Sequence, residues 1–333
     1  MSRRPTILVA MSRATWTDLY TPEVAHRLTA LADVDPSVVV EDFDRVPDLT
    51  DVEVLLTGWG CPPVDASVLD RAPNLKAIVH TAGSVKHHVT QACWDRGIVV
   101  SSAVEENALP VAEYTLAAIL FSQKRVIEVS HAYRAIRGQV AWAAAYPSMG
   151  NYRRTVGIVG ASRIGRRVIE LLKPFDVEVV LADPTIDDAE AQSLGATLVE
   201  LDQLMTVADT VSLHAPSIPE TAGMIDRQRL SLMPDGAVFI NTARGALVDE
   251  AALTDELVSG RLHGVLDVTE DDVLASDSPL WDLPNVLLTP HLAGSMGDEL
   301  ARLVDHALDE LERWSAGQRF AAPVDPDRLG SSA

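Results

Sequence analysis

The chain has 333 residues, 47% of them apolar, which is enough for two domains with cores of their own. Its net charge of −21 argues against nucleic acid and anionic membranes as partners, because both attract basic surfaces. Two cysteines, Cys61 and Cys93, are too few for a disulfide framework or a metal cluster. With no signal-peptide segment and no apolar stretch long enough to span a membrane, we expect a cytoplasmic protein without a metal site.

The first hundred residues alternate short apolar strands with helices. Strands are expected at Thr6–Ala10, Val38–Val40, Val52–Leu56, Leu75–Val79 and Ile98–Val100, and helices at Pro22–Leu31, Val64–Arg71 and Val85–Asp95. This alternation is typical of a compact parallel α/β unit. A long helix is then predicted from about Pro110 to Arg137, with Asn107 near its start, as a connector between domains. Gly138–Tyr152 is expected to be irregular.

The segment Thr155–Gly165 has the pattern of a dinucleotide-binding turn. An apolar strand meets a tight turn at Gly160, a helix begins at Arg163, and a second strand ends at Asp183. In such a βαβ unit the helix N-terminus binds a pyrophosphate and the acid accepts hydrogen bonds from a ribose diol. Because Asp183 would repel a phosphate on that ribose, the sequence favours NAD over NADP.

Ser162 departs from the G-x-G-x-x-G pattern, since it occupies the place of the second glycine. Its Cβ reduces the clearance for a pyrophosphate, although its hydroxyl can donate to a phosphate oxygen. A tight βα turn that binds no nucleotide is the alternative.

The second α/β unit continues to about His291. Its six strands are expected at Val156–Gly160, Val177–Asp183, Thr210–His214, Ala237–Asn241, Val265–Val268 and Val286–Thr289, with a helix at Asp249–Ser259 among those that separate them. Six parallel strands with the glycine turn first predict a doubly wound sheet. Asp298–Trp314 is expected to be a final amphipathic helix, and the tail Ala321–Ala333 to fray.

Three polar residues directly follow or close strands of this unit: Arg244, Asp267 and His291. Each alone has an ordinary interpretation, as a surface arginine, a helix cap and one of nine histidines. Because the carboxyl ends of parallel strands face the ligand crevice, the three together predict a catalytic site.

These segments resemble the D-isomer-specific 2-hydroxyacid dehydrogenase family. The resemblance is carried by Gly157–Gly165, Asn241–Asp249, Gly264–Val268 and Leu283–Gly294, and upstream by His80–Ser84 and Asn107–Glu113. It implies two doubly wound α/β domains: a flavodoxin-like substrate domain and an inserted Rossmann NAD domain. The implied boundaries are 1–104 for the N-terminal part of the substrate domain, 105–294 for the NAD domain, and 295–333 for a helix returning to the substrate domain plus a flexible tail. Members are usually homodimers.

The resemblance also implies a reaction, reversible hydride transfer between NAD(H) and a 2-hydroxy acid and 2-keto acid pair. His291 would be the general acid and base, and Arg244 would hold the carboxylate and carbonyl oxygens. The predicted substrate-binding residues are Trp59, Ala82, Gly83, Ser84 and Arg244. The predicted cofactor-binding residues are Gly160, Ser162, Arg163, Ile164, Gly165, Asp183, His214, Ala215, Pro216, Thr221, Thr242, Ala243, Asp267 and Gly294. Asp267 is similar to the family acid that binds the nicotinamide carboxamide.

The third catalytic position departs from the family. Where members place a glutamate that pairs with the histidine, this chain has Asp272, one methylene shorter. We expect Asp272 to pair with His291 directly or through a water, with Glu270 as the alternative partner.

Two other functions share this pattern. One is a non-catalytic NAD-sensing protein of the same fold, which the changes at Ser162 and Asp272 would allow. The other is a dehydrogenase of a different small anion, such as formate or phosphite. The sequence does not identify the 2-hydroxy acid or the physiological direction.

Overall fold

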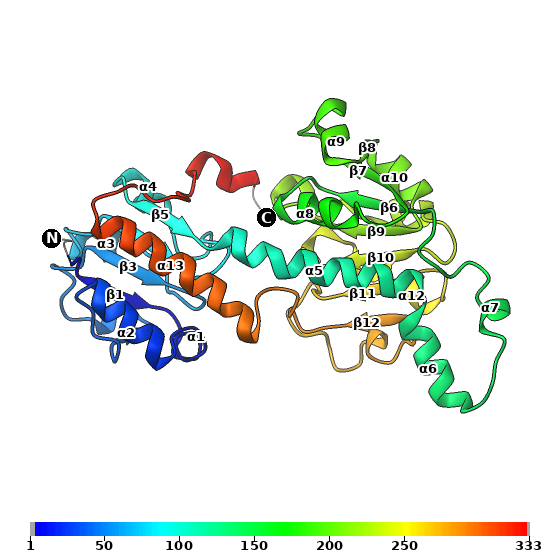
Figure 1. The fold of residues 1–333 in the computed structure, drawn as a ribbon, viewed down its shortest axis with the longest axis horizontal. Helices are drawn as coiled ribbons and strands as arrows, with labels where there is room; N and C mark the ends of the chain where they lie inside the picture. The colour runs from blue at the N-terminus through cyan, green and yellow to red at the C-terminus, as the bar shows by residue number, and fades with distance from the viewer. Residues whose placement is uncertain (1–3, 332–333) are drawn as a thin grey trace. The chain divides into compact units, whose positions relative to one another are not determined.

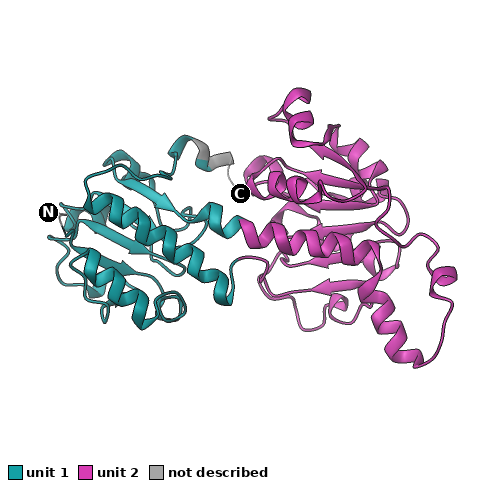
Figure 2. Ribbon diagram, viewed as in Figure 1, with its two compact units in different colours: residues 1–108, 295–330 teal, residues 109–294, 331–333 magenta. Residues whose placement is uncertain are grey.

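A computed structural model describes residues 4–331, without the side chains of residues 328, 330 and 331. The chain forms two compact units, coloured separately in Figure 2. Unit 1 comprises residues 1–108 and 295–330, and unit 2 comprises residues 109–294. The border at residue 108 falls inside the helix that begins at Val104. No helix of the described residues is long and apolar enough to cross a membrane.

Unit 1 is built on a five-stranded parallel sheet in the order β2-β1-β3-β4-β5, the flavodoxin-like arrangement. The strands are β1 (Ile7–Ala10), β2 (Val39–Val40), β3 (Val54–Thr57), β4 (Ala77–His80) and β5 (Val99–Ser102). The helices are α1 (Arg13–Leu19), α2 (Pro22–Leu31), α3 (Ala66–Arg71), α4 (Gln91–Asp95), the start of α5 (Val104–Gln123), and α13 (Leu300–Ser315). Figure 1 labels these elements.

Helices cover both faces of the unit 1 sheet, and successive side chains of each strand point to opposite faces. Val54 and Leu56 point into a core shared with α1, α2 and α13, whereas Leu55 points into a second core with α3 and α4. Because side chains on a strand alternate between faces, the consecutive residues Val54, Leu55 and Leu56 are buried in two different cores. The apolar runs that predicted these strands therefore reflect a sheet buried on both sides.

Unit 2 holds a seven-stranded parallel sheet in the order β12-β11-β10-β9-β6-β7-β8. The strands are β6 (Arg154–Val159), β7 (Val177–Ala182), β8 (Thr197–Leu198), β9 (Thr210–Leu213), β10 (Val238–Asn241), β11 (His263–Leu266) and β12 (Val286–Leu288). The helices are the rest of α5, α6 (Val126–Ile136), α7 (Trp142–Ala145), α8 (Arg163–Leu172), α9 (Asp188–Leu194), α10 (Leu201–Val207), α11 (Arg227–Leu232) and α12 (Glu250–Val258). Strand order reverses between β6 and β9, which is where doubly wound sheets bind ligands.

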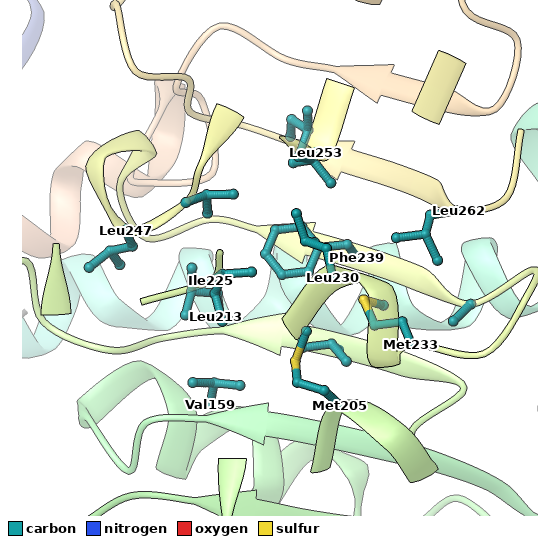
Figure 3. Close-up of a cluster of buried hydrophobic side chains, with 14 of the residues drawn as sticks. Val159, Met205, Leu213, Ile225, Leu230, Met233, Phe239, Leu247, Leu253 and Leu262 are labelled. Carbon is teal, nitrogen blue, oxygen red and sulfur yellow. The ribbon is translucent and has the colours of Figure 1, made fainter. Parts of the chain in front are cut away.

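Two cores flank this sheet as well. On one face Phe239 packs with residues of α10, α11 and α12, including Met205, Leu230 and Leu253 (Figure 3). On the other face Ile158 and its neighbours pack against α5 and α8. The predicted fold class, two doubly wound α/β domains, is confirmed.

The predicted single helix from about Pro110 to Arg137 is wrong in its start and in its continuity, whereas its end agrees with that of α6 at Ile136. α5 already begins at Val104 and ends at Gln123, and α6 follows after Arg125, whose φ of 53° lies in the left-handed region. At this break the Arg125 side chain donates to the carbonyl oxygen of Gly236, 111 residues along the chain. Such a break depends on tertiary packing and leaves no local mark in the sequence.

Smaller predictions were also wrong. Only Gln91–Asp95 of the predicted helix Val85–Asp95 is helical, and the helix α1, the short helix α7 and the two-residue edge strand β8 were missed. The described part of the tail is held rather than frayed, because the Glu310 carboxylate accepts hydrogen bonds from the N–H groups of Ala321 (2.9 Å) and Ala322 (2.8 Å). Residues 332–333 of that predicted tail lie outside the described residues.

Candidate functional site

The glycine turn between β6 and α8 has the geometry of a dinucleotide cradle. Gly160 adopts a φ of 101°, and a Cβ there would lie 2.7 Å from the backbone nitrogen of Ala215. Only glycine satisfies both the left-handed backbone and this close approach. β6 therefore ends in a turn tight enough to direct the first amides of α8 toward a ligand.

Ser162 serves as the N-cap of α8. Its Oγ accepts a hydrogen bond from the Gly165 N–H at 3.3 Å, and its φ of −66° is ordinary for any residue. The serine thus causes no backbone strain at the position of the missing glycine. Its hydroxyl proton stays available for a phosphate oxygen. Ile164 and Gly165 form the first turn of α8, and Arg163 is exposed beside them.

Asp183 follows β7 and is tied to the same turn. Its Oδ2 accepts from the Ala161 N–H at 2.6 Å, and its Oδ1 accepts from the N–H and hydroxyl of Thr185. A carboxylate oxygen has two lone pairs, so Oδ2 keeps one for a ribose hydroxyl. The predicted pairing of the glycine turn with this acid is present as a direct contact.

The loop after β9 contains four predicted cofactor residues. His214 is 1% exposed, its Nε2 is 2.9 Å from the Ser212 hydroxyl, and burial lowers its pKa to about 3. Thr221 donates to the Pro216 carbonyl oxygen at 2.6 Å and accepts from Ile218. The hydroxyl of Thr221 therefore donates its one proton within its own loop. Ala215 is buried against Gly160.

The loop after β10 is closed by the side chain of Asn241. Its Nδ2 donates to the Arg244 carbonyl oxygen, and its Oδ1 accepts from the Ala243 N–H, both at 3.0 Å. Thr242 is buried, with its hydroxyl 3.1 Å from that of Thr115. Arg244 is exposed and donates to the Ala243 carbonyl oxygen at 2.6 Å. The guanidinium thus extends from a loop whose backbone is fixed.

Gly245 fits against the loop that follows β11. A Cβ on Gly245 would lie 2.0 Å from the Thr269 carbonyl oxygen and 2.4 Å from the Glu270 nitrogen. The loop that carries Arg244 and the loop that carries Asp272 are therefore in direct backbone contact. Neighbouring strands β10 and β11 bring the two loops together.

Asp267 clamps the loop that carries His291. Its Oδ1 accepts from the Thr289 hydroxyl (2.6 Å) and the Leu292 N–H (2.9 Å), and its Oδ2 accepts from the Ala293 N–H (2.9 Å). The His291 N–H donates to the Asp267 carbonyl oxygen at 2.8 Å. His291 itself has a φ of 53°, a strained value for a side chain of this size. The clamp holds His291 in that conformation and presents its ring as an exposed group.

The clamp extends to α5. The Tyr114 hydroxyl is 2.7 Å from that of Thr289, and since Thr289 donates to Asp267, Tyr114 is the donor to Thr289. The pKa of Tyr114 is raised mainly by burial and also by the nearby charge of Asp267, so the phenol keeps its proton. Asn241, Gly245, Thr289 and Tyr114 were not predicted as site residues. Their contribution depends on contacts between loops that the sequence pattern does not reveal.

The predicted pair of Asp272 and His291 is not formed within the described residues, where no hydrogen bond or ion pair joins them. Both side chains are exposed. Glu270, the alternative, is also exposed, and its N–H donates to Glu250 at 2.6 Å. The assignment of the histidine partner stays a prediction.

The predicted substrate residues lie in unit 1, at the carboxyl ends of β3 and β4. Trp59 follows β3 and is 42% exposed, and its carbonyl oxygen accepts from Ser12 at 2.9 Å. Ala82 and Gly83 are buried and Ser84 is half-buried. A Cβ on Gly83 would lie 3.3 Å from the Asn107 amide nitrogen, so the loop is closely packed.

Unit 2 thus brings Arg244, Asp267 and His291 to the ends of three adjacent strands, β10, β11 and β12. Gly294, also predicted, directly follows the clamped residues Leu292 and Ala293. The glycine turn stands at the end of β6 in the same sheet. No group of acidic, histidine or cysteine side chains suited to a metal occurs in the described part of the chain.

Comparison with known proteins gives consistent matches. Residues 116–293 match the family model described as D-isomer specific 2-hydroxyacid dehydrogenase, NAD binding domain. The glyoxylate reductase of Korarchaeum cryptofilum is 32% identical over 281 residues, covering 83% of this chain and 82% of that protein. The structure of D-lactate dehydrogenase from Aquifex aeolicus, complexed with NAD and lactic acid, matches with a TM-score of 0.73 and 26% identity over 94% of this chain and 96% of that one.

Other relatives are longer. The D-3-phosphoglycerate dehydrogenase of Mycobacterium leprae is 34% identical over 265 residues, which is 79% of this chain and 49% of that protein. The chain therefore spans about half the length of the phosphoglycerate dehydrogenases that it matches.

Proposed function

Because the chain belongs to the D-isomer specific 2-hydroxyacid dehydrogenase family, we propose that it is an oxidoreductase that moves a hydride reversibly between NAD(H) and a 2-hydroxy acid and 2-keto acid pair. The observation that carries the proposal is the arrangement in unit 2. Arg244, Asp267 and His291 stand at the ends of adjacent strands, in the sheet whose first strand ends in the glycine turn. An arginine and a histidine at the same edge of one sheet are suited to an anionic substrate and to proton transfer.

The glycine turn fits NAD. Gly160 allows the close approach, Ser162 offers a hydroxyl proton, and Asp183 retains a lone pair for a ribose hydroxyl. A ribose phosphate would meet the Asp183 carboxylate, which supports NAD over NADP. When bound, NAD supplies the nicotinamide carbon that accepts or gives the hydride.

The protein side chains then have separate roles. Arg244 would hold the carboxylate and the carbonyl oxygen of the keto acid, since its planar fork can donate to both. An imidazole nitrogen of His291 would give a proton to the carbonyl oxygen in reduction and take the hydroxyl proton in oxidation. The backbone of Ala82, Gly83 and Ser84 would bind the other carboxylate oxygen, and Trp59 would border the substrate's side chain. Asp272 would pair with His291.

The test is NADH oxidation with glyoxylate, hydroxypyruvate, pyruvate, 3-phosphohydroxypyruvate and phenylpyruvate. We expect one of these acids to be reduced and Arg244→Ala to lose about 100-fold to 1,000-fold in kcat/KM, as when a donor to a developing oxyanion is removed. Arg227→Ala is the matched control, because Arg227 is an exposed arginine of the same unit that forms an ion pair with Asp255 at 2.7 Å. An equal loss in both variants would contradict the assigned role of Arg244.

The same assay separates the other two functions. A protein that binds NADH but reduces no keto acid, and oxidises neither formate nor phosphite with NAD⁺, is an NAD-sensing binding protein. Oxidation of formate or phosphite alone would identify a dehydrogenase of another anion.

We also propose that the chain forms a homodimer through α6. No residue of α6, the helix labelled in Figure 1, is buried, and the structure describes this helix in full. Tyr133 and Ile136 are 58% and 53% exposed. An apolar helix face of this kind is stabilised when a second copy covers it. Sedimentation equilibrium should find a dimer for the wild type and a monomer for Ile136→Asp. Val258→Asp, at an equally exposed position on α12, should stay dimeric.

A further inference from the structure

A row of buried polar side chains runs across the carboxyl edge of the unit 1 sheet. Thr57, His80 and Ser102 are the last residues of β3, β4 and β5 and are Cα partners in register. All three are at most 3% exposed. Because neighbours in register point to the same face, the three side chains form one line directly beneath the loop Ala82–Ser84.

This row binds the carbonyl oxygens of that loop. The Ser102 hydroxyl donates to the carbonyl oxygens of Ala82 (3.1 Å) and Gly83. The His80 ring hydrogen-bonds the backbone of Ser84, and this is the one interaction that raises the pKa of His80, as donation from a ring N–H to a carbonyl oxygen does. The carbonyl groups of Ala82 and Gly83 are thus held toward the sheet by Ser102, and the backbone of Ser84 interacts with the His80 ring.

The direction of these carbonyl groups determines the direction of the N–H groups that follow them. In a trans peptide the N–H of the next residue points opposite to the carbonyl, and no described residue has a cis peptide bond. The N–H groups of Gly83, Ser84 and Val85 therefore point away from the row. Within the described residues, none of these three N–H groups donates to the protein. Successive free amides that converge in a packed loop form a site for an anion, because buried donors are otherwise paired.

The tautomer of His80 determines which groups donate in its contacts with Thr57 and, beyond it, His88. The Thr57 Oγ1 lies 2.9 Å from the His80 Nδ1 and 3.2 Å from the His88 Nε2. If the His80 proton is on Nε2, facing Ser84, then Nδ1 must accept from the Thr57 hydroxyl, and Thr57 must accept from the His88 N–H. Burial lowers the pKa of His80 well below its ordinary value and that of His88 to about 4, so both rings are neutral, as this chain of donors requires.

We propose that Thr57 and His80 are positioning residues, which orient the Gly83–Val85 amides so that they bind the carboxylate of the substrate. This inference rests on the proposed function, and it assigns roles to side chains that touch neither substrate nor cofactor. The alternative is a satisfied polar cluster that only stabilises the fold.

Two matched pairs of variants test the proposal. Thr57→Val removes the hydroxyl at nearly constant volume, whereas Thr57→Ser keeps it. His80→Leu removes the donor to Ser84, whereas His80→Gln places an N–H near the position of Nε2. The readouts are the Kd of oxamate, an unreactive 2-oxo acid analogue, by titration calorimetry with and without NADH, then KM and kcat for the keto acid, and the midpoint of thermal unfolding.

We expect Thr57→Val and His80→Leu to raise the oxamate Kd and the keto acid KM about tenfold, the value of one good hydrogen bond, while kcat changes little. Thr57→Ser and His80→Gln should stay near the wild type. Unchanged oxamate affinity in Thr57→Val and His80→Leu overturns the proposal. So does an equal loss in both members of each pair, which would indicate a structural role alone.

The two proposals fail in different ways. A wild type that binds oxamate but reduces no keto acid contradicts the proposed function, and the variants still decide the role of Thr57 and His80. A wild type that binds no oxamate overturns the positioning role even if a keto acid is reduced.

Discussion

The carboxyl edges of the two sheets are built in opposite ways. In unit 1, neutral side chains hold the carbonyl oxygens of the loop Ala82–Ser84 and leave its amides free. In unit 2, the Asp267 carboxylate accepts hydrogen bonds from the N–H groups of Leu292 and Ala293, and the His291 side chain is exposed. One edge presents backbone donors and the other presents functional side chains.

The difference follows from the charge of the residue below each loop. A carboxylate can only accept, so it pairs with N–H groups, whereas a hydroxyl or a neutral imidazole can donate to carbonyl oxygens. An edge that must bind an anion through its backbone has to keep its amides unpaired, and a buried carboxylate there would both occupy them and repel the ligand. The identity of a single buried side chain thus decides what each loop can bind.

Asp267→Asn should give the largest effect. An amide has one acceptor atom in place of two, so the N–H of Leu292 or Ala293 loses its partner, at a cost of about 1–3 kcal/mol, and His291 is released from its strained φ. We expect kcat to fall at least about 100-fold while the Kd of NADH, measured by fluorescence titration, changes little. Asp271→Asn, an exposed acid of the loop after β11, is the charge-matched control.

Thr289→Val separates this clamp from a role in cofactor binding. It removes one donor to Asp267 and leaves the carboxylate charged. A clamp predicts a lower kcat for Thr289→Val as well. If Asp267 serves only to bind the nicotinamide carboxamide, Asp267→Asn should instead raise the Kd of NADH and Thr289→Val should leave both constants near the wild type.

An effect of intermediate size is expected from acid, which should lower the free energy of unfolding through His88, at the carboxyl edge of the unit 1 sheet. Burial, followed by the charge of His87, lowers the pKa of His88 from 6.5 to about 4 in the folded protein. The unfolded chain therefore binds the proton first as pH falls below 6.5, and stability is lost between pH 6.5 and about 4. At pH 5 we expect His88 to have cost about 2 kcal/mol of unfolding free energy relative to pH 8.

Urea unfolding of the wild type and His88→Gln at pH 8 and pH 5 measures that cost. The variant keeps an N–H for Thr57 but cannot titrate, so its loss on acidification should be smaller by about 2 kcal/mol. His263→Gln is a useful comparison in unit 2, because burial likewise lowers the pKa of His263 to about 4. Equal losses in the wild type and His88→Gln would mean that His88 does not govern the acid response of this edge.

The sequence predicted the sheets better than the contacts between their loops. The apolar residues of the predicted strands Val52–Leu56 and Ala237–Asn241 indicated buried parallel strands, because a strand covered on both faces buries apolar side chains on both. The same pattern placed Arg244, Asp267 and His291 at strand ends. It gave no sign that Asp267 clamps the His291 loop, since that depends on the register of β11 against β12.

The polar row of unit 1 was missed for a similar reason. His80 was named only as the first residue of the family-like segment His80–Ser84 and not as a site residue, whereas burial makes it a neutral donor. Burial of a single histidine depends on which strands flank it, and here β3 and β5 place Thr57 and Ser102 on either side. Strand order is a global property, so local sequence patterns did not disclose the row.

The smallest effect is expected at Ser162, the one departure in the glycine turn. Since Ser162 has an ordinary φ and caps α8, Ser162→Gly should cost only a few tenths of a kcal/mol in stability. If the hydroxyl donates to the pyrophosphate, the same variant should bind NADH about threefold to tenfold more weakly, the value of one hydrogen bond. Ser162→Ala separates the hydroxyl from the Cβ, because it keeps the bulk and removes the donor. Tighter NADH binding by Ser162→Gly would mean instead that the Cβ obstructs the cofactor, and that the serine departs from the pattern at a cost in affinity.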